Sequence, residues 1–162
     1  MRPRRPRLDP AHYIGFQRYF LTFCTTRRRP WFAQADVVQS VLEQILQSAA
    51  LFDVAVIAYC FMPDHVHLLI ESCSENADVA AFVHQAKQRS GYAFACRGLG
   101  LLWQPSYYDR ILRDDEASVS VARYIFENPV RAGIVMSPGE YAFAGSSRYT
   151  KEQILDAICW QP

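Results

Sequence analysis

The chain contains 162 residues, a length typical of one domain, and 51% of them are hydrophobic while 20% are charged. No apolar run reaches the roughly 18–20 residues of a membrane-spanning helix. The N-terminus lacks an apolar secretory signal, and the five cysteines contain no C-x-x-C pair, which argues against a disulfide framework or a cysteine zinc site. These features predict a globular domain with reduced thiols in a cytoplasm.

The net charge of +1 conceals an uneven distribution of charged residues along the chain. Residues 1–29 contain eight arginines and one acid, whereas the other 133 residues contain nine basic and fifteen acidic side chains. The basic segment comprises an N-terminal arm, residues 1–11, and an arginine turn, Arg27-Arg28-Arg29. The near-neutral total argues against a nucleic-acid protein, whereas clustered arginines attract phosphates, so charge alone leaves open whether this basic segment is an interaction arm on a mildly acidic body or an accident of composition.

Four segments are predicted as strands because β-branched, aromatic and other apolar residues dominate them. In chain order they are residues 18–26, 53–61, 65–71 and 106–113. Pro63-Asp64 separates the second from the third, and this breaker predicts a tight hairpin between them.

Apolar residues at spacings of three and four predict helices. These cover residues 34–50, 77–96 and 115–128, and a short amphipathic helix within 149–162 is expected to dock on the domain. The third helix is predicted to end at Asn128, because Pro129 lacks an amide donor and restricts the residue before it.

The resulting order, β-α-β-β-α-β followed by an extra helix, predicts an α+β fold with a ferredoxin-like antiparallel sheet. We expect one domain over residues 12–148, preceded by the arm and followed by a docking tail, residues 149–162. RNA-recognition modules share this order of elements, so topology alone does not select a function.

His65 and His67 form the sharpest local pattern. Side chains two residues apart in a strand lie on the same face, so both imidazoles are suitably placed to bind one divalent ion. The spacing also fits two histidines on a half-exposed sheet without an ion. Leu69 occupies the position where a histidine-triad hydrolase continues the alternation, which argues against that class.

Tyr124 and Asn128 are four residues apart on the last predicted long helix, so they share a face. An amide oxygen is a suitable ligand for Mg²⁺ or Mn²⁺, and a tyrosine becomes a useful nucleophile when a metal activates the reacting centre. Two simpler interpretations stay open: Tyr124 packs in the core, and Asn128 caps the helix.

Three stretches occur in order along the chain: Y-C-F-M-P-D-H-V-H-L-L-I at 59–70, W-Q-P-S-Y-Y-D-R-I-L-R-D at 103–114 and V-A-R-Y-I-F-E-N-P-V-R-A-G-I-V at 121–135. Together they resemble the HUH single-tyrosine transposases, specifically the branch of REP-associated tyrosine transposases. The resemblance covers roughly residues 12–148.

This resemblance implies that His65, His67 and Asn128 are ligands of a divalent ion, Mg²⁺ or Mn²⁺, and that Tyr124 is the catalytic nucleophile. It also implies cleavage and strand transfer of single-stranded DNA beside a hairpin, through a 5′-phosphotyrosine and without a nucleotide cofactor. The protein is then expected in a bacterial cytoplasm, acting on DNA of the nucleoid. A monomer is favoured over a dimer that exchanges the tyrosine helix.

Basic and aromatic residues outside this site are candidates for phosphate contact and base stacking. The candidates are Arg2, Arg4, Arg5, Arg7, Arg27, Arg28, Arg29, Lys87, Arg89, Trp103, Tyr108, Arg110 and Arg113, with Arg123 and Arg131 as further phosphate contacts. For each of them the alternative is a solvated charge or a packed ring.

Two other functions remain open at this point. One is a nucleic-acid-binding ferredoxin-like module without catalysis, against which the third strand carries histidines where RNA-recognition modules carry aromatic residues. The other is a metal-dependent phosphoesterase that uses the histidine pair with water, so that Tyr124 has no chemical role.

Overall fold

The computed structural model describes residues 10–113 and 115–158. The strands are β1 (Arg18–Cys24), β2 (Val54–Met62), β3 (His65–Ser72), β4 (Tyr108–Leu112) and β5 (Ala144–Gly145). The helices are α1 (Ala35–Leu51), α2 (Val79–Cys96), α3 (Asp115–Arg131) and α4 (Lys151–Ala157). Short 3-10 turns lie at Pro10–Tyr13, Thr26–Arg28, Trp31–Ala33 and Pro138–Glu140. The arginines of the arm, Arg2, Arg4, Arg5 and Arg7, lie outside the described residues.

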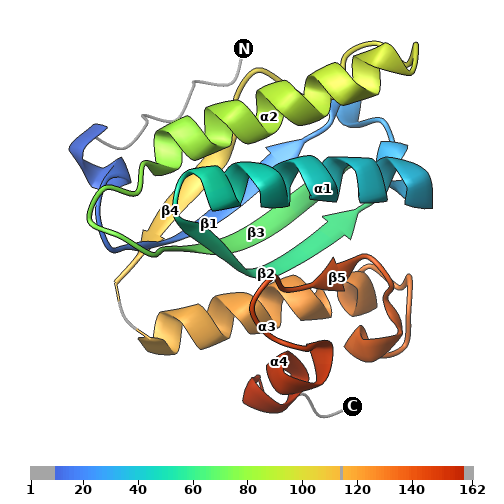
Figure 1. The fold of residues 1–162 in the computed structure, drawn as a ribbon. Helices are drawn as coiled ribbons and strands as arrows, with labels where there is room; N and C mark the ends of the chain where they lie inside the picture. Colours follow the sequence, from blue (N-terminus) through green and yellow to red (C-terminus); the bar gives the residue numbers. More distant parts are fainter. Residues whose placement is uncertain (1–9, 114, 159–162) are drawn as a thin grey trace, which may run out of the picture.

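The five strands form one antiparallel sheet in the order β4-β1-β3-β2-β5. Helices α1 and α2 cover one face of the sheet, α3 lies against the other, and α4 lies beyond α3 (Figure 1). The first four strands have the order and connections of a ferredoxin-like fold, which confirms the predicted α+β class. The two-residue strand β5, which pairs with β2, was not expected from the sequence.

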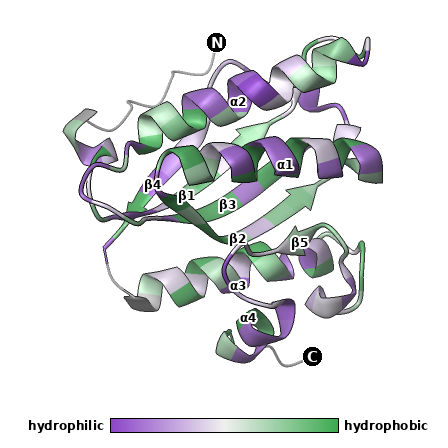
Figure 2. Cartoon of the chain, in the orientation of Figure 1, coloured by the Kyte–Doolittle hydropathy of each residue, from purple (hydrophilic) through white to green (hydrophobic). Residues whose placement is uncertain are grey.

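The core consists of two apolar layers, one on each side of the sheet. Alternate residues of β1, namely Tyr19, Leu21 and Phe23, are fully buried in the layer under α1 and α2. The intervening residues of β1 face α3. Figure 2 shows apolar residues of α1 and α3 on the sides that approach the sheet. The sheet therefore has a buried centre on both faces, and a site under α3 is built from alternate residues of β1 and β3.

Helix α3 continues past the predicted end at Asn128 and reaches Arg131, so the prediction that Asn128-Pro129 terminates it was wrong. A proline in the last turn removes one hydrogen bond, and the following turn still closes. Gly133, at φ +71°, ends the helix: its amide donates to the Val130 carbonyl, and the Ile134 amide donates to the Pro129 carbonyl, both at 2.9 Å. Asn128 is therefore a helical residue with a side chain available for another role.

The C-terminal helix α4 packs beneath α3. Thr150 caps its first turn by accepting from the Gln153 amide, in a reciprocal capping box. Ile154 and Ile158 are buried in the apolar layer under α3, and Arg123 donates two hydrogen bonds to the Ile158 carbonyl, at 3.0 and 2.8 Å. The Arg123 guanidinium thus holds the tail in place. None of the described helices has the length and apolar character needed to cross a membrane.

Candidate active site

His65 and His67 lie at the start of β3 on the face covered by α3. The Nε2 atoms of the two imidazoles are 3.1 Å apart, and the ring centroids are 4.6 Å apart. The strand alternation predicted that the two rings would share a face, and the geometry confirms that they converge on one point.

The other ring nitrogens of the pair have partners of their own. Nδ1 of His67 lies 2.8 Å from the Thr22 hydroxyl, and Nδ1 of His65 lies 2.6 Å from Asp64 Oδ1. When each Nδ1 carries its proton and donates it to these oxygens, each Nε2 presents a lone pair. A pair of neutral imidazoles with both Nε2 atoms directed to one point is the arrangement that a shared cation requires.

Burial keeps His67 in this neutral form. Its side chain is only 6% exposed, and burial, with smaller contributions from His65 and Arg28, lowers the pKa of His67 to about 3. Charging an imidazole away from water is unfavourable, and two neighbouring positive groups make it more so. His67 is therefore uncharged at physiological pH.

Tyr124 lies on α3, which packs across β2 and β3. Its ring centroid is 5.5 Å from that of His67 and 5.8 Å from that of Phe20, with both pairs of rings edge to face. The side chain is 40% exposed, so a substrate has access to it. The interpretation of Tyr124 as a core residue is thus wrong. The fold brings the first and third sequence stretches together, because α3 places this tyrosine next to His67.

Asn128 lies one helical turn beyond Tyr124. Its amide nitrogen is buried and has no hydrogen-bond partner among the described residues. A buried polar group without a partner is unfavourable and uncommon in native proteins. Because the oxygen and nitrogen of an amide exchange places by rotating about one bond, this position can also present the oxygen as an acceptor or ligand.

The donor set fits a divalent ion. The two Nε2 atoms, 3.1 Å apart, are close enough for one cation to be bound by both. Within residues 10–113 and 115–158, no three His, Cys, Asp or Glu side chains come together as metal ligands. The candidate donors are the two imidazoles and, from its place one helical turn beyond Tyr124, the amide of Asn128; donors of this kind carry no negative charge and would leave the positive charge of an ion available to phosphate oxygens.

Part of the predicted DNA-binding set shares this face of the sheet. Tyr108 pairs with Thr22 across β4 and β1, and its ring contacts Phe20 at 5.9 Å. Arg110, the next residue of β4 on that face, is exposed, and so is Arg113 just beyond the strand. Tyr108 and Arg110 thus form an aromatic and basic edge on the face of the histidines, whereas Arg113 lies at the far end of the sheet, beside Arg18 and Glu71.

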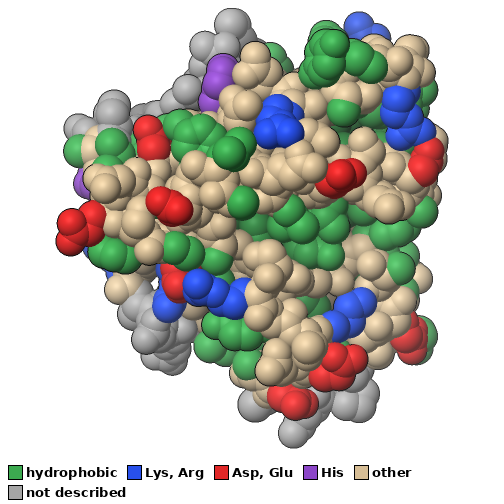
Figure 3. Space-filling model, viewed as in Figure 1, with side chains coloured by type: hydrophobic (Ala, Val, Ile, Leu, Met, Phe, Trp, Pro, Cys, Tyr) green, Lys and Arg blue, Asp and Glu red, His purple; other side chains and the backbone are tan. Residues whose placement is uncertain are grey.

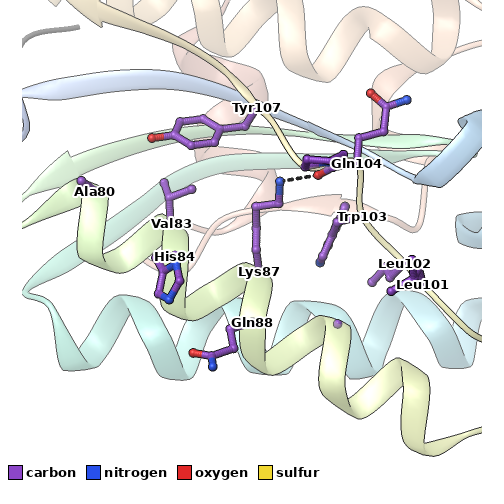
Figure 4. Close-up of a pocket in the computed structure, with 12 residues that line it drawn as sticks. Ala80, Val83, His84, Lys87, Gln88, Leu101, Leu102, Trp103, Gln104 and Tyr107 are labelled. Carbon is purple, nitrogen blue, oxygen red and sulfur yellow. Dashed lines mark hydrogen bonds between the residues drawn. The ribbon is translucent and has the colours of Figure 1, made fainter. Parts of the chain in front are cut away.

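Three other candidates, Lys87, Arg89 and Trp103, lie on or next to α2, at the opposite face of the sheet from the histidines. The Lys87 amine donates to the carbonyls of Gln104 (2.8 Å) and Ser106 (3.0 Å), and the Trp103 indole donates to the Ser90 hydroxyl (2.9 Å). Figure 4 shows Lys87 and Trp103 lining a pocket of about 430 Å³ between α2 and the segment before β4.

Arg89 donates to two glutamines of α1, at 3.1 and 2.6 Å, and so ties α2 to α1. Lys87 and Trp103 anchor the chain that leads from α2 into β4. All three side chains are therefore engaged in holding the domain together. On the face seen in Figure 3, acidic and basic side chains are interspersed, without a large patch of one sign.

The arginine turn has an unusual backbone. Arg27 and Arg28 have φ values of +56° and +55°, in the left-handed region that residues with a side chain seldom adopt. Arg28 folds back, and its Nε donates to Asp64 Oδ2 at 2.8 Å. Arg27 and Arg29 are exposed, and neither side chain has a hydrogen bond or ion pair within the described part of the chain. Arg27 and Arg29 of the turn therefore face solvent, whereas Arg28 contacts Asp64, the partner of His65.

Sequence reasoning missed Thr22 and Asp64 as partners of the histidines. Asp64 had a local signal, because it directly precedes His65 in the P-D-H-V-H stretch. Thr22 had none, since its place opposite His67 depends on the pairing register of β1 with β3.

Comparisons with known proteins agree on one family. A sequence model of the family described as "Transposase IS200 like" matches residues 16–128. A Haemophilus influenzae protein described as a REP-associated tyrosine transposase is 22% identical over 147 residues, which cover 84% of this chain and 83% of that protein.

Solved structures show the same fold. A REP-associated tyrosine transposase bound to a REP hairpin superimposes with a TM-score of 0.73 at 21% identity, over 89% of this chain and 82% of the other. A Deinococcus radiodurans structure described as a transposase gives a TM-score of 0.52 at 23% identity, over 78% and 97%. With the family match extending over most of the domain, the chain belongs to the IS200-like transposase family.

Proposed function

We propose that this protein cleaves and rejoins single-stranded DNA beside a hairpin, with Tyr124 as the nucleophile. The observation that carries the proposal is the position of the Tyr124 ring, whose centroid is 5.5 Å from that of the His67 ring. The two residues are distant in the sequence, because α2 and β4 lie between β3 and α3 along the chain. A phosphoesterase that uses water has no need of an exposed tyrosine at this point. A binding module has no need of two converging imidazoles, one of them buried.

We assign His65, His67 and Asn128 as the residues that hold Mg²⁺ or Mn²⁺. Two Nε2 atoms 3.1 Å apart and a buried amide without a partner support this assignment. When bound, such an ion polarises the scissile phosphate and offsets the negative charge that develops in the transition state. His67 offers a neutral imidazole at physiological pH, because burial lowers its pKa to about 3.

Tyr124 supplies the covalent chemistry. Its hydroxyl gives up its proton as the oxygen attacks the scissile phosphorus, the bond from phosphorus to the 3′-oxygen breaks, and the departing 3′-oxygen takes up a proton, so that no proton is gained or lost overall. The product is a 5′-phosphotyrosine and a free 3′-hydroxyl. Because one phosphoester bond replaces another, a second 3′-hydroxyl can reverse the step and join a new strand without a nucleotide cofactor.

We assign the DNA to the edge beside the histidines. Tyr108 offers a half-buried ring for stacking and Arg110 a charge for phosphates, and Arg113, farther along the sheet, offers a second charge. The exposed arginines of the turn, Arg27 and Arg29, extend this surface. The hairpin bound by the structural relative, a REP hairpin, is the model for the substrate that we propose here.

A covalent-capture experiment tests the proposal. The protein is incubated with Mn²⁺ and a single-stranded DNA that carries a hairpin and a label at its 3′ end, on the fragment that stays attached to the tyrosine, and adducts that survive SDS are resolved by electrophoresis. We expect an adduct with the wild type, none with Tyr124→Phe, and an undiminished one with Tyr92→Phe. Tyr92 is a suitable control because it is an exposed tyrosine on α2, at the other face of the sheet.

Two outcomes contradict the proposal. Cleavage that persists in Tyr124→Phe would assign the attack to water and the protein to the phosphoesterases. Binding of the hairpin without cleavage, in either Mg²⁺ or Mn²⁺, would leave a nucleic-acid-binding module.

A further inference from the structure

We propose that Arg28 and Asp64 are positioning residues for His65: they hold its ring so that Nε2 faces the ion. This inference rests on the proposed function of the histidine pair. It adds a specific role to the arginine turn, which the sequence had indicated only as a group of phosphate contacts.

The Asp64 carboxylate joins the arginine turn to the histidine. Its Oδ1 lies 2.6 Å from His65 Nδ1, and its Oδ2 accepts from Arg28 Nε at 2.8 Å. Both oxygens are therefore engaged, one by the imidazole and one by the guanidinium. A carboxylate held in this way orients the ring and selects the tautomer with the proton on Nδ1, which leaves the Nε2 lone pair for a ligand.

Arg28 is in turn held by contacts from β1. Its Nη1 donates to the Cys24 sulfur at 2.7 Å, and Cys24 is the residue of β1 that pairs with His65 of β3. The guanidinium is thus fastened to the strand next to the histidine, and it restrains Asp64 from rotating away. About half of the Arg28 side chain is exposed, so an ion pair of this kind contributes little to the stability of the fold, and its main effect is orientation.

The backbone of the turn is shaped for this contact. Two successive residues with side chains at φ +56° and +55° are unfavourable, and such a conformation persists only where the surroundings impose it. The buried Thr25 provides that restraint: its hydroxyl is 2.8 Å from the Arg29 carbonyl and 3.0 Å from the Asp64 carbonyl. Its amide also donates to the Asp64 carbonyl at 3.0 Å.

Strain of this type clusters at functional sites. Here it has an identifiable geometric consequence, because the left-handed residues direct Arg28 toward Asp64 while Arg27 and Arg29 remain in solvent. Of the three arginines of the turn, Arg28 therefore contacts Asp64, while Arg27 and Arg29 remain available to a ligand in solution.

A matched pair of variants tests the role of Arg28. Asparagine tolerates the left-handed conformation, so Arg28→Asn and Arg27→Asn make the same chemical change in the same backbone geometry. Only Arg28→Asn removes the contact with Asp64. Mn²⁺ affinity is measured from the electron paramagnetic resonance signal of the free ion, with the thermal midpoint of each variant as a check on folding.

We expect Asp64→Ala and Arg28→Asn to weaken Mn²⁺ binding at least about tenfold, the usual effect of removing a group that orients a metal-binding histidine. Arg27→Asn should stay within about twofold of the wild type, as for a surface substitution. Arg28→Lys, which retains a positive charge but lacks the guanidinium, should bind Mn²⁺ more tightly than Arg28→Asn and less tightly than the wild type. Equal Mn²⁺ affinities for Arg28→Asn and Arg27→Asn would overturn the assignment.

A second measurement needs no metal. Long-range ¹⁵N–¹H correlation spectra of the metal-free protein report which nitrogen of His65 carries the proton. We expect Nδ1 in the wild type and in Arg27→Asn, and a shift toward Nε2 in Asp64→Ala. An unchanged tautomer in Asp64→Ala would refute the positioning role.

The two measurements separate this inference from the proposed function. If His65→Ala binds Mn²⁺ as tightly as the wild type, the proposed metal site fails, and the tautomer still decides whether Asp64 orients the ring. If the wild type forms the Tyr124 adduct and the Arg28 and Asp64 variants show no change in affinity or tautomer, the function stands and the positioning role is wrong.

Discussion

The guanidinium of Arg131 lies over the ring of Tyr124, with its central carbon 4.6 Å from the ring centroid. Its Nη2 also lies 3.3 Å from the Tyr124 carbonyl and 3.4 Å from Glu127 Oε2, so the side chain runs back along α3 toward the nucleophile. This contact exists because α3 continues beyond Pro129; a helix that ended at Asn128 would not place Arg131 two turns after Tyr124.

We therefore predict that Arg131→Gln slows formation of the Tyr124 adduct. A cation over an exposed aromatic ring contributes about 1 kcal/mol, and its attraction grows as the phenol loses its proton, so we expect a rate at least about fivefold lower. The measurement is the single-turnover rate of adduct formation as a function of pH. Glu127→Gln is the control, because it removes the acidic neighbour and leaves the cation in place; equal rates for both variants would contradict the prediction.

The pH dependence of stability should report on His67. Its pKa of about 3 in the folded protein lies below the ordinary value of 6.5, so the unfolded chain binds more protons between these limits. The contribution to stability is fully present above pH 6.5 and is lost progressively as the pH falls toward 3.

Replacement of this histidine should flatten that profile. We expect the free energy of unfolding of His67→Asn, measured with urea at pH 4, 5, 6 and 7, to vary less with pH than that of the wild type, by an amount on the order of several kcal/mol across the window. Parallel profiles for the two proteins would show that His67 titrates normally in the fold.

The active site should be complete within one chain. Tyr124 meets His67 of the same chain, so a mixture of His67→Ala and Tyr124→Phe should form no adduct. Exchange of the tyrosine helix between subunits would instead restore activity in the mixture. The elution volume from size exclusion, compared with and without DNA, gives the oligomeric state in the same samples; restored adduct formation would contradict a monomer acting in cis.

DNA binding should depend steeply on salt and draw on both parts of the basic segment. Each lost phosphate contact lowers the slope of log affinity against log salt by about 0.7 for a single strand. We expect a reduced slope when residues 1–8 are deleted, and again for the double variant of Arg27 and Arg29 to glutamine. Arg97→Gln serves as the control because Arg97 pairs with Asp36 on the other face; an equal loss there would indicate a general charge effect.

The local patterns predicted the framework of this protein well. The strand and helix bounds agree within one or two residues at most ends, because alternation and helical spacing are decided by which side chains must face an apolar layer. The predicted end of α3 at Asn128 was wrong, because Pro129 is tolerated in the last turn and the helix ends only where the amides of Gly133 and Ile134 donate to the carbonyls of Val130 and Pro129. Strand β5 was missed because two residues carry no periodic signal.

By itself the sequence determined the order of elements, the shared face of His65 and His67, and the spacing of Tyr124 and Asn128, all of which follow from the fixed periods of strands and helices. Only the tertiary structure decided that α3 lies across β3, that Thr22 stands opposite His67 and that Arg28 turns inward while Arg27 does not. Those relationships depend on sheet register, on burial and on contacts between residues distant in the chain, and no local pattern encodes them.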